Sequence, residues 1–522
     1  MRIVVARMLL SIKHYTKGPY TLYNPLDLSV TTVKEPVMHK WLPNDTVNPT
    51  AGTVISREKR NVVGIVNFLN RTGMGFTSRN VPLYLFHPLD SGYPPMIVSS
   101  KVRHEHNMIA LVAIEHWTEK WPRAGIVKLL GNVGNTAVEK EALLLRSKIP
   151  TTDVMDYVEP TFTNEEWDNV FNIDPDGCED VDDILCWRRR GDDTEFGIGI
   201  ADVASWIPEG SALDTYASRA GQTLYSDGVA VAPMLPTVVS GQRASLRCDG
   251  VARPVLMLCY TLREGRIVSK EWKRCGIVVH RVFTYESVKK DVDVCTELVT
   301  LLTSVLGCDV GGDPHVWIER TMVLYNTEVA TVLHTHNKGV LRSHEGRSDN
   351  EWATLAELTG CRELAFLGSA AGTYVSANVE GGVSHAGLGL DVYCHASSPL
   401  RRYADLVNQR WLHHIVFGGV TPLAVCNPWH LNQRNSMSKT FDRDMWFLTH
   451  LKTDTITTVT GYVLSAKDDG MYGVYVPEWK RKVRGKGDGV LAVGARVHVR
   501  AYTDIKSCSW EHRIVCSLQE WV

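Results

Sequence analysis

The chain has 522 residues, of which 44% are hydrophobic and 22% are charged. This composition excludes a disordered or fibrous protein, and at roughly 100–200 residues per domain we expect about three domains. No uncharged apolar run reaches the roughly 18 residues of a membrane span, which indicates no membrane partner. The twelve cysteines include no CxxC pair, so we expect reduced, buried thiols in an intracellular protein rather than a zinc or disulfide framework.

The net charge of −2 conceals an uneven distribution along the chain. Residues 1–150 carry a net charge of +9, residues 151–454 carry −14, and residues 455–522 carry +3. Basic ends attract a polyanion, and an acidic centre can hold cations that act on it. The charge pattern therefore makes nucleic acid a candidate ligand.

Residues 1–50 contain scattered proline, asparagine and threonine without a sustained apolar period, so we predict an N-terminal extension. Four basic residues precede the first acidic residue, Asp27, with apolar residues between them: Arg2, Arg7, Lys13 and Lys17. An acid-free, amphipathic start is typical of an organelle-targeting presequence, which would place the protein in mitochondria. An ordinary basic tail on a cytoplasmic protein fits the same residues.

Residues 51–150 are predicted to form a small β-barrel. Between residues 62 and 117, short apolar runs alternate with glycine and proline turn signals, which is typical of short strands. The apolar spacing of residues 137–149 then predicts a helix.

Residues 151–454 mix both kinds of element, so we predict a mixed α/β domain. Short apolar runs predict strands at 196–200 and 255–260, and longer apolar periods predict helices at 317–336, 350–371 and 400–416. Pro399 suits the first turn of the last helix.

Residues 455–522 are predicted to form a second small barrel. The expected strands cover residues 458–465, 472–476, 497–502 and 513–518. Among residues 480–486, five side chains are basic: Lys480, Arg481, Lys482, Arg484 and Lys486. Both a basic hairpin that binds nucleic acid and a solvated surface turn fit this run.

The most informative segment is acidic. Six carboxylates fall within residues 174–183, with no lysine or arginine among them. Two carboxylates about 4 Å apart repel by roughly 4 kcal/mol at an effective dielectric constant near 20, so a convergent group needs a cation or solvent between its members. The segment lies between apolar residues, which argues against a solvated loop, and Cys178 and Glu179 break the pattern of a calcium-binding loop. Oxygen ligands suit Mg²⁺ or Mn²⁺, and two such ions can activate a water and brace the leaving oxygen of a phosphodiester.

A second segment, residues 395–405, places Arg401 and Arg402 side by side in the first turn of a predicted helix. Guanidinium groups near a positive helix end are a good seat for phosphate. We expect one of the two arginines to be functional and the other to form a structural salt bridge.

The spacing D-x5-D-x-D-D at Asp174, Asp180, Asp182 and Asp183 resembles the signature of the RNB (ribonuclease II/R/Dis3) family of 3′→5′ exoribonucleases. The resemblance covers roughly residues 160–420 and continues in family order through residues 199–203, 223–225, 233–236, 341–345 and 397–403. It implies an α+β fold: a mixed α/β RNB catalytic core at 151–454, flanked by a cold-shock-like barrel at 51–150 and an S1-like barrel at 455–522, both of OB type.

The resemblance also implies the roles of individual residues. The four aspartates would bind Mg²⁺ (or Mn²⁺), with Asp182 and Asp183 catalytic, and Arg401 would contact the scissile phosphate. Tyr225 would stack on the 3′-terminal nucleotide and Tyr285 would contact RNA nearby. The expected partner is single-stranded RNA, with a helicase or a ribonucleoprotein assembly as a candidate protein partner.

Several positions depart from the family pattern. The family's sugar-recognising glutamate aligns with Arg320, which puts RNA-versus-DNA discrimination in doubt. Gln409 replaces a usual histidine, and the stretches between Tyr285 and residue 317 and between residues 345 and 385 are short.

Two functions stay open at this point. The first is a metal-dependent 3′→5′ exoribonuclease that releases nucleoside 5′-monophosphates. The second is a non-catalytic RNA-binding scaffold subunit that keeps only the fold, which the short stretches and Arg320 favour. The complete set of aspartates favours the enzyme, because buried unpaired carboxylates are expensive to retain without a metal.

Overall fold

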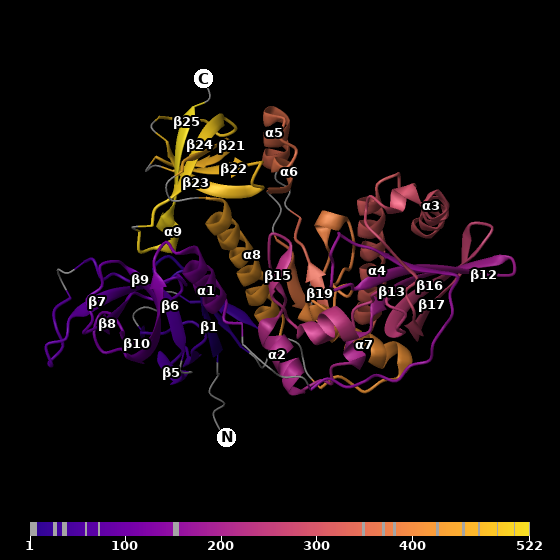
Figure 1. The fold of residues 1–522 in the computed structure, drawn as a ribbon, viewed down its shortest axis with the longest axis horizontal. Coiled ribbons are helices and arrows are strands. Elements are labelled where there is room, and N and C mark those ends of the chain that lie inside the picture. The colour runs from indigo at the N-terminus through magenta and orange to yellow at the C-terminus, as the bar shows by residue number, and fades with distance from the viewer. Residues whose placement is uncertain are drawn as a thin grey trace. The chain divides into compact units, whose positions relative to one another are not determined.

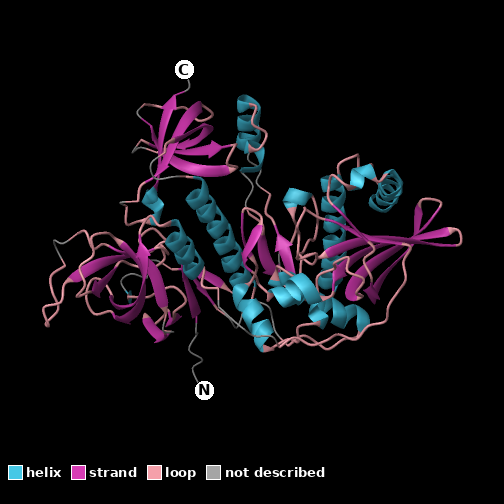
Figure 2. Ribbon diagram, viewed as in Figure 1, coloured by secondary structure: helices cyan, strands magenta, loops and turns pink. Residues whose placement is uncertain are grey.

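The computed structural model describes residues 8–24, 29–33, 39–57, 60–70, 74–149, 156–346, 350–367, 371–378, 383–423, 427–451, 455–467, 470–487, 489–505 and 507–520. The chain forms two compact units (Figures 1 and 2). The barrel unit contains Met1–Lys148, Ser348–Gly368 and Lys439–Val522, and the core unit contains Ile149–Arg347 and Ser369–Ser438. None of the described helices combines the length and apolar character needed to cross a membrane.

The barrel unit begins with a five-stranded sheet in the order β3-β2-β1-β4-β5. Its strands are β1 (Met8–Ile12), β2 (Tyr20–Tyr23), β3 (Val30–Thr32), β4 (Thr46–Asn48) and β5 (Thr53–Ser56). The predicted extension over residues 1–50 is therefore wrong. The strands are only three to five residues long, too short for an alternating pattern to stand out from the intervening turn residues.

The same strands account for part of the amphipathic N-terminus. Met8, Leu10 and Ile12 alternate on the buried face of β1, which is a strand period rather than a helical one. Arg2 and Arg7 of the predicted presequence lie outside the described residues.

A closed barrel follows, with the strand order β10-β8-β7-β6-β9. Its elements are β6 (Asn61–Val66), β7 (Leu83–Pro88), β8 (Met96–Ser99), β9 (Met108–His116), β10 (Arg123–Asn132) and helix α1 (Thr136–Arg146). The parallel pairing of β8 with β10 closes it. When the barrel is followed as a ring from its third strand, β8, its order matches that of the N-terminal sheet, β3-β2-β1-β4-β5. In the described residues of the N-terminal sheet, however, β3 and β5 do not pair.

A second closed barrel lies at the C-terminal end and repeats this order, with β23 and β25 as the parallel closing pair. Its elements are β21 (Thr457–Ala466), β22 (Met471–Val476), β23 (Arg481–Gly487), β24 (Arg496–Thr503), α9 (Trp510–Arg513) and β25 (Ile514–Glu520). We call it the C-terminal barrel. An ion pair joins it to α1: Arg513 Nη1 lies 2.7 Å from Glu139 Oε2, and both side chains are buried.

The core unit is built on a six-stranded sheet in the order β17-β16-β13-β12-β11-β18. The strands are β11 (Asn169–Ile173), β12 (Asp183–Arg190), β13 (Asp193–Ala201), β16 (Arg253–Arg263), β17 (Arg266–Ile277) and β18 (Arg281–Phe283). Only β11 and β18 pair in parallel. The apolar runs predicted at 196–200 and 255–260 form the buried parts of β13 and β16.

Helices and two small sheets complete the core unit. The helices are α2 (Ala212–Ala220), α3 (Val292–Leu306), α4 (Pro314–Thr335), α7 (Tyr403–Phe417) and the first part of α8 (Pro428–His450). The small sheets pair β14 (Leu224–Ser226) with β15 (Val229–Ala232), and β19 (Val340–Ser343) with β20 (Thr373–Ser376). The described cysteines are all free thiols, although Cys248 and Cys308 are exposed rather than buried.

The predicted helix over 350–371 is broken in two: α5 (Asn350–Thr359) and α6 (Leu364–Leu367). Gly360 has a φ of +67° directly after α5, a left-handed conformation that ends a helix readily at glycine. The two helices belong to the barrel unit although β19 and β20, which flank them in the sequence, belong to the core unit.

Candidate active site

The acidic segment is the connection between two paired strands of the core sheet. Asp174 follows β11 directly, Asp183 is the first residue of β12, and these strands pair antiparallel. Ser245 holds the connection in place: its Oγ accepts from Val181 N at 3.0 Å and donates to the Glu179 carbonyl at 2.7 Å. The strand pairing thus brings residues nine positions apart to the same edge of the sheet.

Asp182 is buried between two donors from the other conspicuous segment. Its Oδ1 accepts from the backbone N of Leu400 at 2.9 Å, and its Oδ2 accepts from Arg401 Nε at 3.3 Å. Burial raises the pKa of Asp182 to about 7, although Arg401 and the Leu400 N–H act in the opposite direction. The two segments singled out in the sequence therefore meet at this side chain.

The neighbouring carboxyl groups are also held in a medium that disfavours their charge. Burial raises the pKa of Asp174 to about 6, with a further contribution from the charge of Asp180. Burial raises the pKa of Asp183 well above its usual value, with contributions from Asp174 and Asp182. A divalent cation would reverse both effects, because it stabilises the ionised carboxylates and screens them from one another.

The donor set fits a hard cation chemically. It consists of carboxylate oxygens, which Mg²⁺ and Mn²⁺ prefer, and Asp174 Oδ2 is a buried oxygen without a hydrogen-bond partner. Within the described residues, however, no three histidine, cysteine or acidic side chains are already grouped closely enough to hold a metal ion. Asp180 and Asp182 instead engage Tyr225 and Arg401.

Tyr225 lies on the hairpin of β14 and β15, and its hydroxyl donates to Asp180 Oδ2 at 2.6 Å. Burial and this hydrogen bond to the carboxylate raise the pKa of the phenol. The predicted role of this residue uses only its ring. The hydroxyl contact adds a second role, in positioning Asp180, which the sequence did not indicate.

Tyr285 follows β18 and stacks on His315 of α4, with ring centroids 3.8 Å apart and an interplanar angle of 20°. Burial raises its pKa, and the charges of Asp174 and Asp183 contribute to the shift. The second predicted tyrosine is therefore within electrostatic range of the aspartates.

The two adjacent arginines have different environments. Arg402 Nη2 lies 2.7 Å from Oδ1 of the buried Asp405, which also accepts from Ser398 N. The Arg401 side chain is 43% exposed beside Asp182, and its Nη2 donates to Ser398 Oγ. This difference agrees with the expectation that one arginine is structural, which is Arg402. Arg401 is the arginine whose guanidinium group can donate hydrogen bonds to a ligand.

The predicted location of the arginines in the first turn of a helix is wrong, because α7 begins at Tyr403. Arg402 forms a bridge with Gln222, and Thr223 N donates to the Arg401 carbonyl. Arg402 is therefore extended, with φ −134° and ψ 123°, and is the residue that caps α7, whereas Arg401 lies in the turn before it. Asp405 and the Leu400 N–H are the members of the site that the sequence reasoning missed; the i, i+3 spacing of Arg402 and Asp405 was the available signal.

Comparison with known families decides the class of fold. A model described as RNB domain matches residues 163–298 and 306–418, a region that contains all four aspartates and Arg401. The chain carries an RNB domain. A model of the Dis3-like cold-shock domain 2 matches residues 83–148, from β7 to the end of the first closed barrel and its helix. The predicted fold class, a mixed α/β RNB core with OB-type barrels, is confirmed.

The RNB domain is similar to that of named exoribonucleases. Exosome complex exonuclease RRP44 of Homo sapiens is 23% identical over 483 residues, which are 74% of this chain and 50% of the relative. Ribonuclease R of Helicobacter pylori is 25% identical over 314 residues, which are 47% of this chain and 48% of the relative. The chain spans about half the length of the curated relatives it matches.

Two solved structures share the fold. Apo RNase R of Mycoplasma genitalium matches with a TM-score of 0.72 at 17% identity, over 98% of this chain and 100% of that one. Yeast Ssd1, described as a pseudonuclease, matches with a TM-score of 0.68 at 15% identity, over 96% and 80%. One fold is thus found in a ribonuclease and in a pseudonuclease.

The departures from the family pattern have structural explanations within the RNB domain. Arg320 Nη1 donates to the Asp309 carbonyl at 2.8 Å, so this side chain is turned onto the loop before α4. Gln409 donates to the Ala201 carbonyl at 2.7 Å and accepts from Ala204 N at 3.2 Å, which satisfies backbone groups at the end of β13 and in the turn after it.

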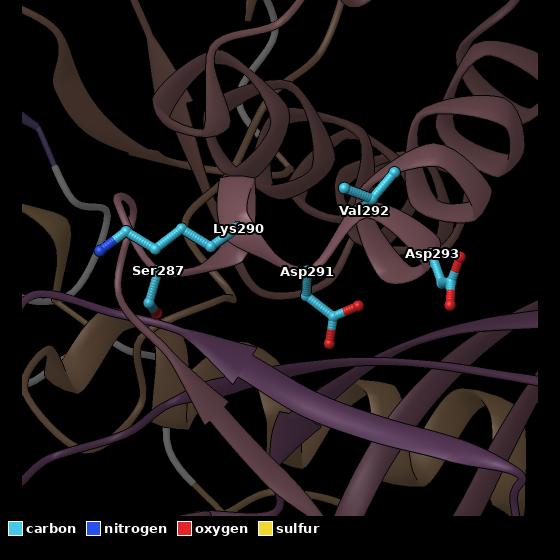
Figure 3. Close-up of a pocket in the computed structure, with 5 residues that line it drawn as sticks. All are labelled: Ser287, Lys290, Asp291, Val292 and Asp293. Carbon is cyan, nitrogen blue, oxygen red and sulfur yellow. The ribbon is translucent and has the colours of Figure 1, made fainter.

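A hollow of about 660 Å³ lies on the segment that follows Tyr285. Figure 3 shows its five lining residues: Ser287, Lys290, Asp291, Val292 and Asp293. Asp291 is already engaged, as the N-cap of α3 and in an ion pair with Arg281. Because none of the four aspartates lines this hollow, it is not the candidate active site.

The basic run of the C-terminal barrel divides into two groups. Arg481 pairs with Asp442 at 2.9 Å and lies over the Trp446 ring, and Lys482 lies over the Trp352 ring. Lys480 lies in the turn before β23, and the exposed Arg484 and Lys486 alternate along that strand with the buried Val483 and Gly485. Lys480, Lys482, Arg484 and Lys486 are exposed, and among the described residues an aromatic ring contact is found for Lys482 but not for the other three.

We expect replacement of Lys480, Arg484 and Lys486 by glutamine to weaken binding of single-stranded RNA and to flatten its dependence on salt. Each lost phosphate contact should reduce the slope of log affinity against log salt by about 0.7. Titrations at several salt concentrations measure this slope. The matched control replaces Arg481 alone, which is held by its ion pair with Asp442; a loss of slope of about 0.7 from this single substitution would contradict the division.

Proposed function

We propose that this chain is a divalent-metal-dependent 3′→5′ exoribonuclease that hydrolyses single-stranded RNA to nucleoside 5′-monophosphates. The observation that carries the proposal is the position of Asp182, which lies buried between the Leu400 N–H and Arg401 with Asp174, Asp180 and Asp183 around it. Exonuclease relatives and an RNB domain support the class of reaction.

The residues divide the chemical work. Asp174, Asp180, Asp182 and Asp183 would hold Mg²⁺ or Mn²⁺, which supplies an activated water and stabilises the leaving oxygen of a phosphodiester. Arg401 would present its guanidinium donors to the scissile phosphate. The rings of Tyr225 and Tyr285 would hold terminal nucleotides by stacking, which tolerates any base because each has a π-face.

A second candidate function is a non-catalytic RNA-binding scaffold. The fold shared with yeast Ssd1 favours it. The retained aspartates argue against it, because buried carboxylates that repel one another destabilise a protein that has no use for a cation.

The proposed exoribonuclease activity also indicates the partners and the cellular compartment. Single-stranded RNA is the proposed ligand. One relative is named as an exosome complex exonuclease, which supports a helicase or ribonucleoprotein assembly as the proposed protein partner. We propose an intracellular location, mitochondrial or cytoplasmic.

The deciding experiment incubates 5′-labelled single-stranded RNA with the whole chain and Mg²⁺, with and without EDTA. We expect a ladder that shortens from the 3′ end and disappears in EDTA. RNA binding without shortening would support the scaffold instead.

Two variants of Tyr225 separate its ring from its hydroxyl. We expect Tyr225→Ala to lengthen the final product by one or more nucleotides, because loss of roughly 1–3 kcal/mol of stacking weakens the grip about five- to 150-fold and short RNAs depend on it most. Tyr225→Phe should keep the product length and slow the reaction, because Asp180 loses its hydrogen bond. Limit digests and melting temperatures measure both. A lowered melting temperature with unchanged product length in Tyr225→Ala would leave this residue a core tyrosine.

A further inference from the structure

The outer face of the C-terminal barrel carries two aromatic rings and a cation in one row. Strand register places Tyr462 of β21 opposite Tyr475 of β22, and Tyr475 opposite Lys482 of β23. The residues that alternate with them, Val463, Val474 and Val483, belong to the barrel core. We call Tyr462, Tyr475 and Lys482 the Tyr–Tyr–Lys row.

This row has the chemistry and the position of a nucleic-acid-binding face. Proteins with OB folds bind oligonucleotides on the face of their second and third strands, which here are β22 and β23. Aromatic rings that stack on bases, together with basic side chains that contact phosphates, make up such faces. The exposed Arg484 and Lys486 extend the basic character along β23.

The hairpin of α5 and α6 covers this row. Tyr475 is 4% exposed and lies in one cluster with Leu355, Cys361 and Leu364 of the hairpin, against which Tyr462 also packs. Lys482 Nζ lies 5.1 Å from the centroid of the Trp352 ring. Figure 1 shows both helices beside the C-terminal barrel. A base could not stack on Tyr475 while the hairpin is in place.

The hairpin presents groups of the same kinds as a nucleotide. The Trp352 ring faces a lysine, as a base would, and burial there lowers the pKa of Lys482. The pKa of Glu363 is lowered, first by hydrogen bonds from its own backbone N–H and from Cys361, and in part by the charge of Lys480. A flat ring thus lies over the lysine of this face, and a carboxylate lies within electrostatic range of Lys480 and Tyr475.

The hairpin can separate from the C-terminal barrel while the strands on either side of it stay paired. It is inserted between β19 and β20, which pair with each other so that Ser343 lies opposite Thr373. Its contact with the barrel is limited: in the described residues the cluster has four buried members, of which three belong to the hairpin, and four partly buried ones. Displacement would expose these few side chains and leave both ends of the insertion side by side.

We propose that the α5–α6 hairpin and single-stranded RNA compete for the Tyr–Tyr–Lys row, so that the hairpin leaves the C-terminal barrel when RNA binds there. The proposal rests on the RNA binding in the proposed function and is independent of its catalytic step.

The test measures binding of a fluorescent oligouridine to the whole chain in EDTA, where no turnover occurs. Leu355 is 8% exposed and Leu358 of the same helix is 78% exposed, so Leu355→Asp should release the hairpin and Leu358→Asp is the matched control. We expect Leu355→Asp to bind RNA roughly fivefold more tightly or better, because a base gains access to Tyr475. The control should bind as the parent does.

A second substitution assigns the gain to the row. Tyr475→Leu keeps the apolar contact with the hairpin but removes the stacking ring. It should lower the affinity of the parent for RNA, because a base bound to the row loses its stacking partner, and it should abolish the gain of Leu355→Asp. Trp352→Ala, which is milder, should give a smaller gain. Melting temperatures show whether each variant is folded.

Hydrogen exchange reports the hairpin directly. We expect the amides of α5 to exchange faster when RNA is added to the parent. Unchanged exchange in α5 with RNA bound, or equal affinities of Leu355→Asp and the parent, would overturn the competition and make the hairpin a permanent cover. If no variant binds RNA, the proposed function falls as well. Tighter binding in EDTA without shortening in Mg²⁺ would remove the catalytic step alone.

Discussion

Asp182→Asn is expected to abolish RNA hydrolysis while leaving RNA binding nearly intact. Asparagine keeps the shape and can still accept the hydrogen bond from Leu400 N, but it removes one anionic ligand and directs an amide toward Arg401. Metal-assisted stabilisation is worth several kcal/mol, and each ~1.4 kcal/mol is tenfold in rate, so we expect a loss of roughly a thousandfold or more. Single-turnover rates and equilibrium binding measure the two quantities separately.

Asp176→Asn supplies the matched control. Asp176 belongs to the same acidic segment but is exposed. We expect this variant to hydrolyse RNA at close to the parent rate, since a solvated carboxylate adds little to a buried site. Hydrolysis by Asp182→Asn at the parent rate would contradict the metal assignment, and equal losses in both variants would point to the net charge of the segment instead.

Substitution of the adjacent arginines is expected to give opposite results. Arg401→Gln removes the half-exposed guanidinium beside Asp182, so we expect a rate loss of about 10²–10³-fold with the melting temperature unchanged. Arg402→Gln leaves the buried Asp405 without its ion-pair partner, which costs about 3–5 kcal/mol, so the melting temperature should fall by roughly 6–20 °C.

Thermal unfolding and single-turnover kinetics on both variants test whether Arg401 acts in the reaction and Arg402 in stability. Each variant serves as the control for the other, because the two residues are neighbours and undergo the same chemical change. Parent-like turnover in Arg401→Gln would remove it from the reaction, and an unchanged melting temperature in Arg402→Gln would mean that the Asp405 pair contributes no net stability.

The candidate site was largely readable from sequence because its parts are local. The four aspartates lie within ten residues, and the arginines lie in one short segment. What could not be read was how the parts engage each other. The bond from Leu400 N to Asp182 spans 218 positions and the bond from Tyr225 to Asp180 spans 45, so both depend on tertiary packing rather than on any spacing in the sequence.

The fold was readable where apolar runs were long enough to show a period. Strand β13 and helix α4 correspond to predicted elements, since each buries several side chains in sequence. The N-terminal sheet was missed because β3 and β4 have three residues each. The placement of α5 and α6 against the C-terminal barrel could not be predicted, because their buried side chains show that they pack but not what they pack against.

The ion pair between Glu139 and Arg513 sets an order for folding during synthesis. These residues lie 374 positions apart, and each would be a buried charge without the other. An unpaired buried charge is strongly destabilising, so the first closed barrel reaches its final packing only after Arg513 has been synthesised. The core unit, in contrast, ends at Ser438. A chain shortened before Arg513 would therefore hold Glu139 as an unpaired charge in the first closed barrel, although the residues of the core unit are all present.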